Sequence, residues 1–103
     1  MKKPPVLLCV SSRRVKLAVG RNVGSGFLVY AGSVASGVTA PSTPASALTL
    51  RDALVAARVL VPSPGGSDAL AFAQDFLFPS PSAAACVVLG MSANGQDVWR
   101  PMA

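Results

Sequence analysis

The feature that most constrains the fold is a run of uncharged residues, 83–89, bounded by a helix start and a helix stop. Ser80 suits the N-cap, and Pro81 suits the first helical position, where its missing N–H leaves no hydrogen bond unmade. Gly90 is placed to end the helix in a left-handed conformation. A helix with no charged face has to be buried nearly all round, so the rest of the chain must fold around it.

The chain is long enough for one domain with a single, modest core. It has 103 residues, of which 51% are hydrophobic and only 13% are charged. A chain this apolar does not stay disordered, because it can bury enough surface to offset the entropy of ordering.

The residue types that are missing exclude most catalytic chemistry. The sequence has no His, and all of its acids are Asp. Without His there is neither a Ser–His or Cys–His nucleophile pair nor a His-ligated zinc site, and the two cysteines cannot complete a four-ligand metal site. A serine activated by Lys2, Lys3 or Lys16 stays formally open, but no other feature marks a nucleophile. We expect a protein that is not an enzyme, with no catalytic residues, no metal and no cofactor.

The N-terminus does not resemble a targeting segment. Met1 is followed by two lysines, but the apolar run over residues 6–10 is too short for a signal peptide. No stretch approaches the ~18 apolar residues of a membrane span. We therefore expect a cytoplasmic protein with reduced thiols, in which Cys9 and Cys86 fill small apolar sites. A disulfide between them is the weaker alternative.

Positive charge is concentrated at the start of the chain. Nine Lys and Arg residues against four Asp give a net charge of +5. Six of the nine cations precede residue 26, and no acid does: Lys2, Lys3, Arg13, Arg14, Lys16 and Arg21. We divide the chain into a basic N-terminal strand region, residues 1–25, and a core domain, residues 26–103.

Residues 27–31 form the clearest strand. They are β-branched or aromatic and apolar on both faces, which predicts a central strand rather than an edge. Shorter strands are predicted over residues 6–10 and 15–19, with a turn-rich segment over 20–26. Residues 35–47 are uncharged and rich in Ser, Thr, Gly and Pro, which predicts a surface loop.

A further helix is predicted over residues 49–58. Thr49 can cap its start, and the negative charge of Asp52 is favourable in its first turn. The apolar residues at helical spacing are Leu50, Ala53, Leu54 and Ala57. The charged residues outside this stripe are Arg51, Asp52 and Arg58. The helix is followed by a predicted hairpin, or wing, with strands over residues 59–61 and 69–72.

The C-terminal segment completes the expected domain. Asn94 and Gly95 predict a turn, and residues 98–99 a final short strand. Trp99 is expected to lay its ring over the alanine surface of the 81–89 helix. We therefore expect a single small α+β domain, in which a mixed or antiparallel sheet around residues 27–31 carries two short helices.

Residues 78–95 also carry a family resemblance. The sequence Phe-Pro-Ser-Pro-Ser-Ala-Ala-Ala, followed by Gly90, Asn94-Gly95 and Trp99, resembles a bacterial domain of unknown function found at the C-terminus of GIY-YIG-type nucleases and other restriction-linked proteins. It is also similar to the restriction-enzyme and adenine-methylase-associated domain. The resemblance extends from about residue 26 to residue 99, with Gly32-Ser33 and Arg51 with Leu54 as supporting matches.

Three positions depart from the family pattern. Pro79 stands where a small polar residue is usual, Met91 where a basic residue is common, and Arg58 where Gly often follows the helix. The loss of a cation at Met91 weakens a phosphate clamp at that turn. The GIY-YIG catalytic residues have no counterpart in this chain, so the resemblance implies no nuclease activity.

Charge and resemblance together predict a non-catalytic DNA-binding accessory module linked to restriction-modification or mobile-element biology. The positive N-terminus of the helix at Ser80 and Ser82 can hold a phosphate, with Asn94 and Arg100 beside it. The residues expected to contact the phosphate backbone are Arg13, Arg14, Lys16, Arg21, Ser80, Ser82, Asn94 and Arg100. The same Ser, Pro, Gly and Asn residues also have a purely structural role as caps and turns.

A protein–protein docking or dimerisation module with no nucleic-acid ligand is the alternative. Few charges and an uncharged loop over residues 35–47 predict apolar surface that a small domain cannot cover. The partner would then be a second copy or a restriction-system protein, not a membrane.

Overall fold

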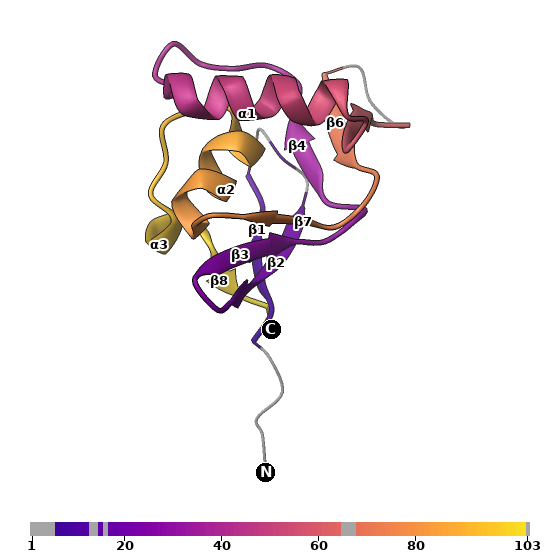
Figure 1. Ribbon diagram of the computed structural model, residues 1–103. Helices are drawn as coiled ribbons and strands as arrows, with labels where there is room; N and C mark the ends of the chain where they lie inside the picture. Colours follow the sequence, from indigo (N-terminus) through magenta and orange to yellow (C-terminus); the bar gives the residue numbers. More distant parts are fainter. Residues whose placement is uncertain (1–5, 13–14, 16, 65–67, 103) are drawn as a thin grey trace.

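The computed structural model describes residues 6–12, 15, 17–64 and 68–102. Over these residues the chain forms three helices and two antiparallel sheets. Figure 1 gives their arrangement. The helices are α1 (Ala45–Ala56), α2 (Pro81–Leu89) and α3 (Gly95–Val98). The five-stranded sheet has the order β7 (Phe76–Phe78), β3 (Gly26–Val29), β2 (Ala18–Val23), β1 (Leu8–Val10) and β8 (Arg100–Pro101). The three-stranded sheet has the order β4 (Val34–Ser36), β6 (Ala69–Phe72) and β5 (Leu60–Pro62). The predicted small α+β domain is confirmed, with three helices instead of two.

The central position of β3 is also confirmed. β3 lies between β2 and β7, and the side chains of Phe27 and Val29 are fully buried. Its two faces differ in burial, because Leu28 and Tyr30 on the other face are only half-buried. One face of the five-stranded sheet packs on α2, and the other carries Leu28.

β2 is displaced along the chain from its predicted position. It runs from Ala18 to Val23, so the predicted turn over residues 20–26 shrinks to Gly24 and Ser25. Gly20 lies inside the strand, where a Cβ would meet the ring of Phe27 at 2.5 Å. The glycine therefore serves close packing in a strand and does not mark a turn.

α2 forms as predicted. The Oγ of Ser80 accepts a hydrogen bond from the Ala83 amide at 3.0 Å, and Gly90 ends the helix with a φ of 67°. Residues 84–89 are all buried. α2 packs on α1, β3, β4 and β7, which places this uncharged helix at the centre of the core (Figure 1).

α1 begins earlier than predicted. Its N-cap is Pro44 and its last residue is Ala56, so residues 45–47 are helical and not part of a loop. β4 likewise occupies part of the predicted loop over residues 35–47. Arg58 follows the helix in a left-handed conformation, with a φ of 60°, at the position where glycine is favoured.

Arg51 is a second correction on α1. Helical periodicity puts it outside the core stripe, yet its side chain is only 6% exposed. Its Nη1 donates to the Val87 carbonyl at 2.6 Å, and its Nη2 donates to the Ser36 carbonyl at 2.7 Å. The Val87 carbonyl belongs to the last turn of α2, where carbonyl groups lack an intrahelical donor and attract positive charge. Arg51 therefore ties α1 to both α2 and β4.

The wing is confirmed, and the C-terminal segment differs in detail. β5 and β6 form an antiparallel hairpin in which Leu60 lies opposite Phe72.

Asn94 caps the short helix α3 instead of only turning the chain, and the last strand is β8 instead of residues 98–99. β7 was not predicted. Trp99 is 5% exposed, as expected for a buried ring, and its Nε1 donates to the Pro81 carbonyl at 3.0 Å.

Cys9 and Cys86 are both free thiols, so the disulfide alternative is wrong. None of the helices in the described parts of the chain has the length and apolar character needed to cross a bilayer.

Candidate nucleic-acid interface

The structure brings three of the predicted site residues together at the start of α2. Ser80 is the N-cap, Ser82 lies in the first turn, and Asn94 caps the neighbouring helix α3. The Oγ of Ser82 accepts a hydrogen bond from the Gly95 amide at 2.9 Å. α3 therefore begins directly against the first turn of α2.

The oxygen atoms of these three side chains are already used in capping. The Oγ of Ser80 accepts from the Ala83 amide, and the Oδ1 of Asn94 accepts from the Gln96 amide at 3.0 Å. A phosphate at this helix end would compete with these caps for the backbone donors. The hydroxyl of Ser82, whose side chain is exposed, can still donate to a ligand.

Arg21 and Arg100 lie on the five-stranded sheet. Arg21 is on β2, and its Nε donates to the hydroxyl of Tyr30 at 2.7 Å. Arg100 is exposed on the edge strand β8, opposite Cys9 of β1. Tyr30 could not be identified from the sequence, because its pairing with Arg21 needs β2 and β3 to be in register. Arg13, Arg14 and Lys16 lie outside the described residues.

The register of the strands puts both arginines on the same face. Cys9 lies opposite Val19 on one side and Arg100 on the other. Arg21 is two residues beyond Val19 on the same strand, so it points to the same face. We call this the outer face of the sheet. The opposite face packs on α2.

The charge of the chain is divided between its two parts. The described residues hold four Arg and four Asp, a net charge of zero: Arg21, Arg51, Arg58 and Arg100 against Asp52, Asp68, Asp75 and Asp97. The chain as a whole has nine cations and a net charge of +5. The remaining five cations, nine minus four, all precede Leu17: Lys2, Lys3, Arg13, Arg14 and Lys16.

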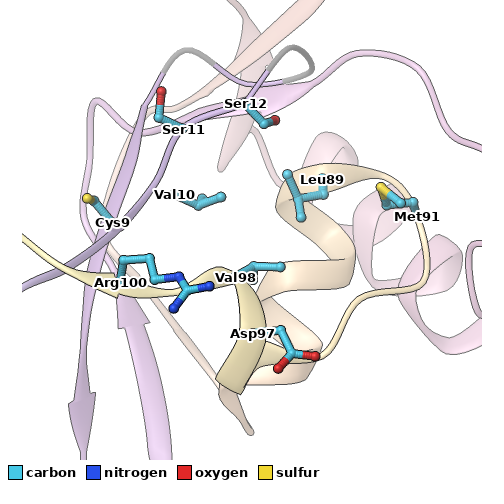
Figure 2. Close-up of a pocket in the computed structure, with 9 residues that line it drawn as sticks. All are labelled: Cys9, Val10, Ser11, Ser12, Leu89, Met91, Asp97, Val98 and Arg100. Carbon is cyan, nitrogen blue, oxygen red and sulfur yellow. The ribbon is translucent and has the colours of Figure 1, made fainter.

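A cavity of about 610 Å³ lies beside Arg100, at the edge of the sheet (Figure 2). Its apolar wall consists of Val10, Leu89, Met91 and Val98. Figure 2 shows Arg100 and Asp97 on one side of this cavity, with Ser11 and Ser12 across from them. Ser12 is followed in the chain by Arg13 and Arg14. The cavity therefore has Arg100 on one wall and, on another, Ser11 and Ser12, which precede the predicted basic residues in the sequence.

A second cavity, of about 440 Å³, lies between α1 and α2. Its lining is almost entirely apolar or small: Pro44, Ser46, Ala47, Leu50, Pro79, Ser82, Ala83 and Cys86. Within the described ranges, His, Cys, Asp and Glu form no group of three or more that would hold a metal ion.

The fold and the site define a small α+β domain with a helix-covered sheet and a basic N-terminal segment. The chain belongs to the family described as domain of unknown function (DUF4357), whose model matches residues 8–103. The match includes β1 and β2 and so extends well before residue 26, where the resemblance was expected to begin. No curated protein and no solved structure matches the chain.

Proposed function

We propose that this domain is a non-catalytic DNA-binding accessory module that serves restriction-modification or mobile-element proteins. It contacts the phosphate backbone through the basic residues that precede Leu17 in the sequence and through the outer face of the sheet. The resemblance of residues 78–99 to domains that accompany GIY-YIG nucleases supports this context.

The distribution of charge is the observation that carries the proposal. The described residues are neutral, and the whole net charge of +5 comes from the segment around β1. Arg21 and Arg100 lie on the strands that flank β1, on one face of the sheet. A chain segment whose charges are all positive, joined to a neutral body, attracts a polyanion and orients it.

Salt dependence of binding tests the proposal. A labelled random duplex, titrated with the full chain at low salt, should show binding that weakens steeply as salt is added. Four phosphate contacts, by Arg13, Arg14, Lys16 and Arg21, imply a slope of log K against log salt of roughly −3.6. Arg13→Ala with Arg14→Ala should flatten this slope by roughly two units and weaken all sequences equally.

The matched control is Arg58→Ala. Arg58 is exposed at the end of α1, a helix that packs on α2 and β5, so its loss removes one positive charge and leaves the slope unchanged. Absence of binding at about 10⁻⁴ M protein, the weak end of non-specific affinity, would contradict the proposal.

The second candidate is a docking or dimerisation module. The exposed apolar side chains of Leu7, Leu77 and Met102 favour it, since they lie on or beside one sheet face. Light scattering that shows a stable dimer, combined with no DNA binding, would favour this alternative.

A further inference from the structure

We propose that the outer face of the five-stranded sheet binds single-stranded DNA, with bases on its apolar side chains and phosphates on Arg21 and Arg100. This inference rests on the proposed function, because it names the form of DNA that the site accepts.

Two rows of side chains cross this face. In the first row, Leu77 of β7, Leu28 of β3 and Arg21 of β2 lie opposite one another. In the second row, Val19 of β2, Cys9 of β1 and Arg100 of β8 do the same. Each row therefore places an arginine next to apolar side chains.

The face carries several exposed apolar side chains. Leu77 is 53% exposed, Leu7 is 38% exposed and Met102 is 44% exposed. Leu7 lies two residues before Cys9, and Met102 lies two residues after Arg100, so both continue the same face. The amide of Met102 donates to the Leu7 carbonyl at 2.9 Å, which keeps the two side chains adjacent. Exposed apolar groups that gather on one face mark an interaction surface.

Tyr30 places an aromatic ring on this face and holds the guanidinium of Arg21 in position. Its amide donates to the Val19 carbonyl at 2.9 Å, and it lies two residues after Leu28, so its ring belongs to the outer face. Its hydroxyl holds the Nε of Arg21 at 2.7 Å, and the Nη donors of Arg21 remain available for a phosphate. An aromatic ring beside a positioned arginine suits an unpaired base with its phosphate.

The chemistry of the face favours a single strand over a duplex. A duplex presents phosphates and groove edges and keeps the planes of its bases stacked inside, so it would offer the apolar rows no partner. A single strand exposes base planes that stack on apolar and aromatic side chains, while its phosphates contact cations. A second copy of the chain is a poorer partner, because the five strands contain two arginines and no acid. Asp75, two residues before Leu77, continues this face beside Tyr30, and its Oδ1 already accepts from the Ala31 amide at 2.7 Å. Face-to-face pairing would bring four arginines together with two carboxylates that are already hydrogen-bonded.

A footprint on Cys9 provides a test that needs no substitution. Cys9 lies between Val19 and Arg100 on the outer face, whereas Cys86 is buried in α2, so alkylation of the folded chain reports on Cys9. Labelled oligo(dT) of about 20 nucleotides is the probe, and a duplex of the same length is the control. We expect oligo(dT) to slow alkylation at least about fivefold and to bind about tenfold more tightly than the duplex.

Leu77→Asp is the matched variant, with Val55→Asp as its control. Both side chains are about half-exposed, at 53% and 48%, but Val55 lies on α1, away from the face. Leu77→Asp should weaken oligo(dT) binding about tenfold or more, and Val55→Asp should change it less than about twofold. The circular dichroism spectrum checks that both variants fold.

The outcomes separate this inference from the proposed function. If duplex and oligo(dT) bind equally, with no protection of Cys9 and no effect of Leu77→Asp, the inference is overturned and the proposed function stands. If neither form of DNA binds, both are overturned. If the chain instead forms a dimer that protects Cys9, the face is an interface between copies and the inference is again overturned.

Discussion

The indole ring of Trp99 lies against the ring of Phe27, with centroids 4.5 Å apart and planes tilted by 38°. Phe27 belongs to the central strand β3, and the indole N–H of Trp99 donates to the Pro81 carbonyl at the start of α2. This contact joins the C-terminal segment to both the sheet and the buried helix. The room for the Phe27 ring depends on Gly20, where any side chain would collide with it.

Substitution of Trp99 should remove a large part of the stability of the domain. Trp99→Ala leaves a cavity beside Phe27 and removes the indole hydrogen bond to the Pro81 carbonyl, so we expect a loss of about 3–5 kcal/mol in the free energy of unfolding. Urea unfolding followed by circular dichroism measures it. Gln96→Ala, at an exposed position of α3, is the control, and an unchanged midpoint for Trp99→Ala would contradict the packing described.

Replacement of Arg51 by either Met or Lys should lower the free energy of unfolding. Arg51→Met preserves most of the apolar bulk but leaves the Val87 and Ser36 carbonyls without a donor, so we expect a loss of roughly 2–4 kcal/mol. Arg51→Lys should also destabilise the fold, because a single ammonium group does not reproduce the two-pronged guanidinium. Asp52→Asn, exposed on the same helix, should lie within about 0.5 kcal/mol of the parent in the same urea titration.

Arg58 offers the opposite test, a substitution that stabilises. Its φ of 60° is left-handed, a conformation that costs an L-residue with a side chain roughly 1–2 kcal/mol. Arg58→Gly should therefore raise the free energy of unfolding by up to about 1 kcal/mol, since part of the gain is lost to the greater freedom of glycine when unfolded. Arg58→Ala removes the same charge but keeps the strain. Equal stability of the two variants would attribute any change to charge.

Ser80 separates capping from phosphate binding. Ser80→Ala should cost about 1 kcal/mol, because the Ala83 amide loses its acceptor. Ser80→Asp keeps an acceptor and places a negative charge at the helix N-terminus, so stability should be retained. If a phosphate sits at this end of α2, Ser80→Asp should weaken DNA binding by repulsion; undiminished DNA affinity would show that the serine acts only as a cap.

We expect no hydrolysis of DNA by the purified chain with added magnesium. The sequence lacks His and Glu, and the described carboxylates of Asp52, Asp68, Asp75 and Asp97 form no cluster of three that would bind a metal ion. Incubation with supercoiled plasmid, followed by electrophoresis, measures nicking. Cleavage that is abolished by Asp52→Asn or Asp75→Asn would contradict this expectation.

Features with local causes could be predicted from the sequence. The cap at Ser80, the proline at position 81 and the stop at Gly90 act within one turn of backbone, so the limits of α2 follow from the chain itself. The wing is similar, because β5 and β6 are close in sequence. Arg51 is the contrasting case. Its partners are 36 and 15 residues away, and helical periodicity gives no sign of them.

The candidate site depends on distant pairings to a greater degree. β7 has only three residues, and it exists as a strand because it pairs with β3 nearly fifty positions earlier. The outer face could not be predicted, because Leu28 is as apolar as its buried neighbours Phe27 and Val29, and hydropathy alone does not distinguish a covered face from an open one. Only the register of the strands brings Arg21, Tyr30 and Arg100 to one side.

The position of β1 in the sheet leaves one of its edges unpaired while the chain is being translated. β1 pairs with β2 on one side and with β8 on the other. The edge of β1 that pairs with β8 therefore stays unpaired until β8 has been synthesised. A ribosome adds roughly 5–20 residues per second, so about 5–20 seconds separate the synthesis of the two strands. During that interval the backbone edge of β1 is open to pairing with a neighbouring nascent chain. The addition of Arg100 and Pro101 closes that edge.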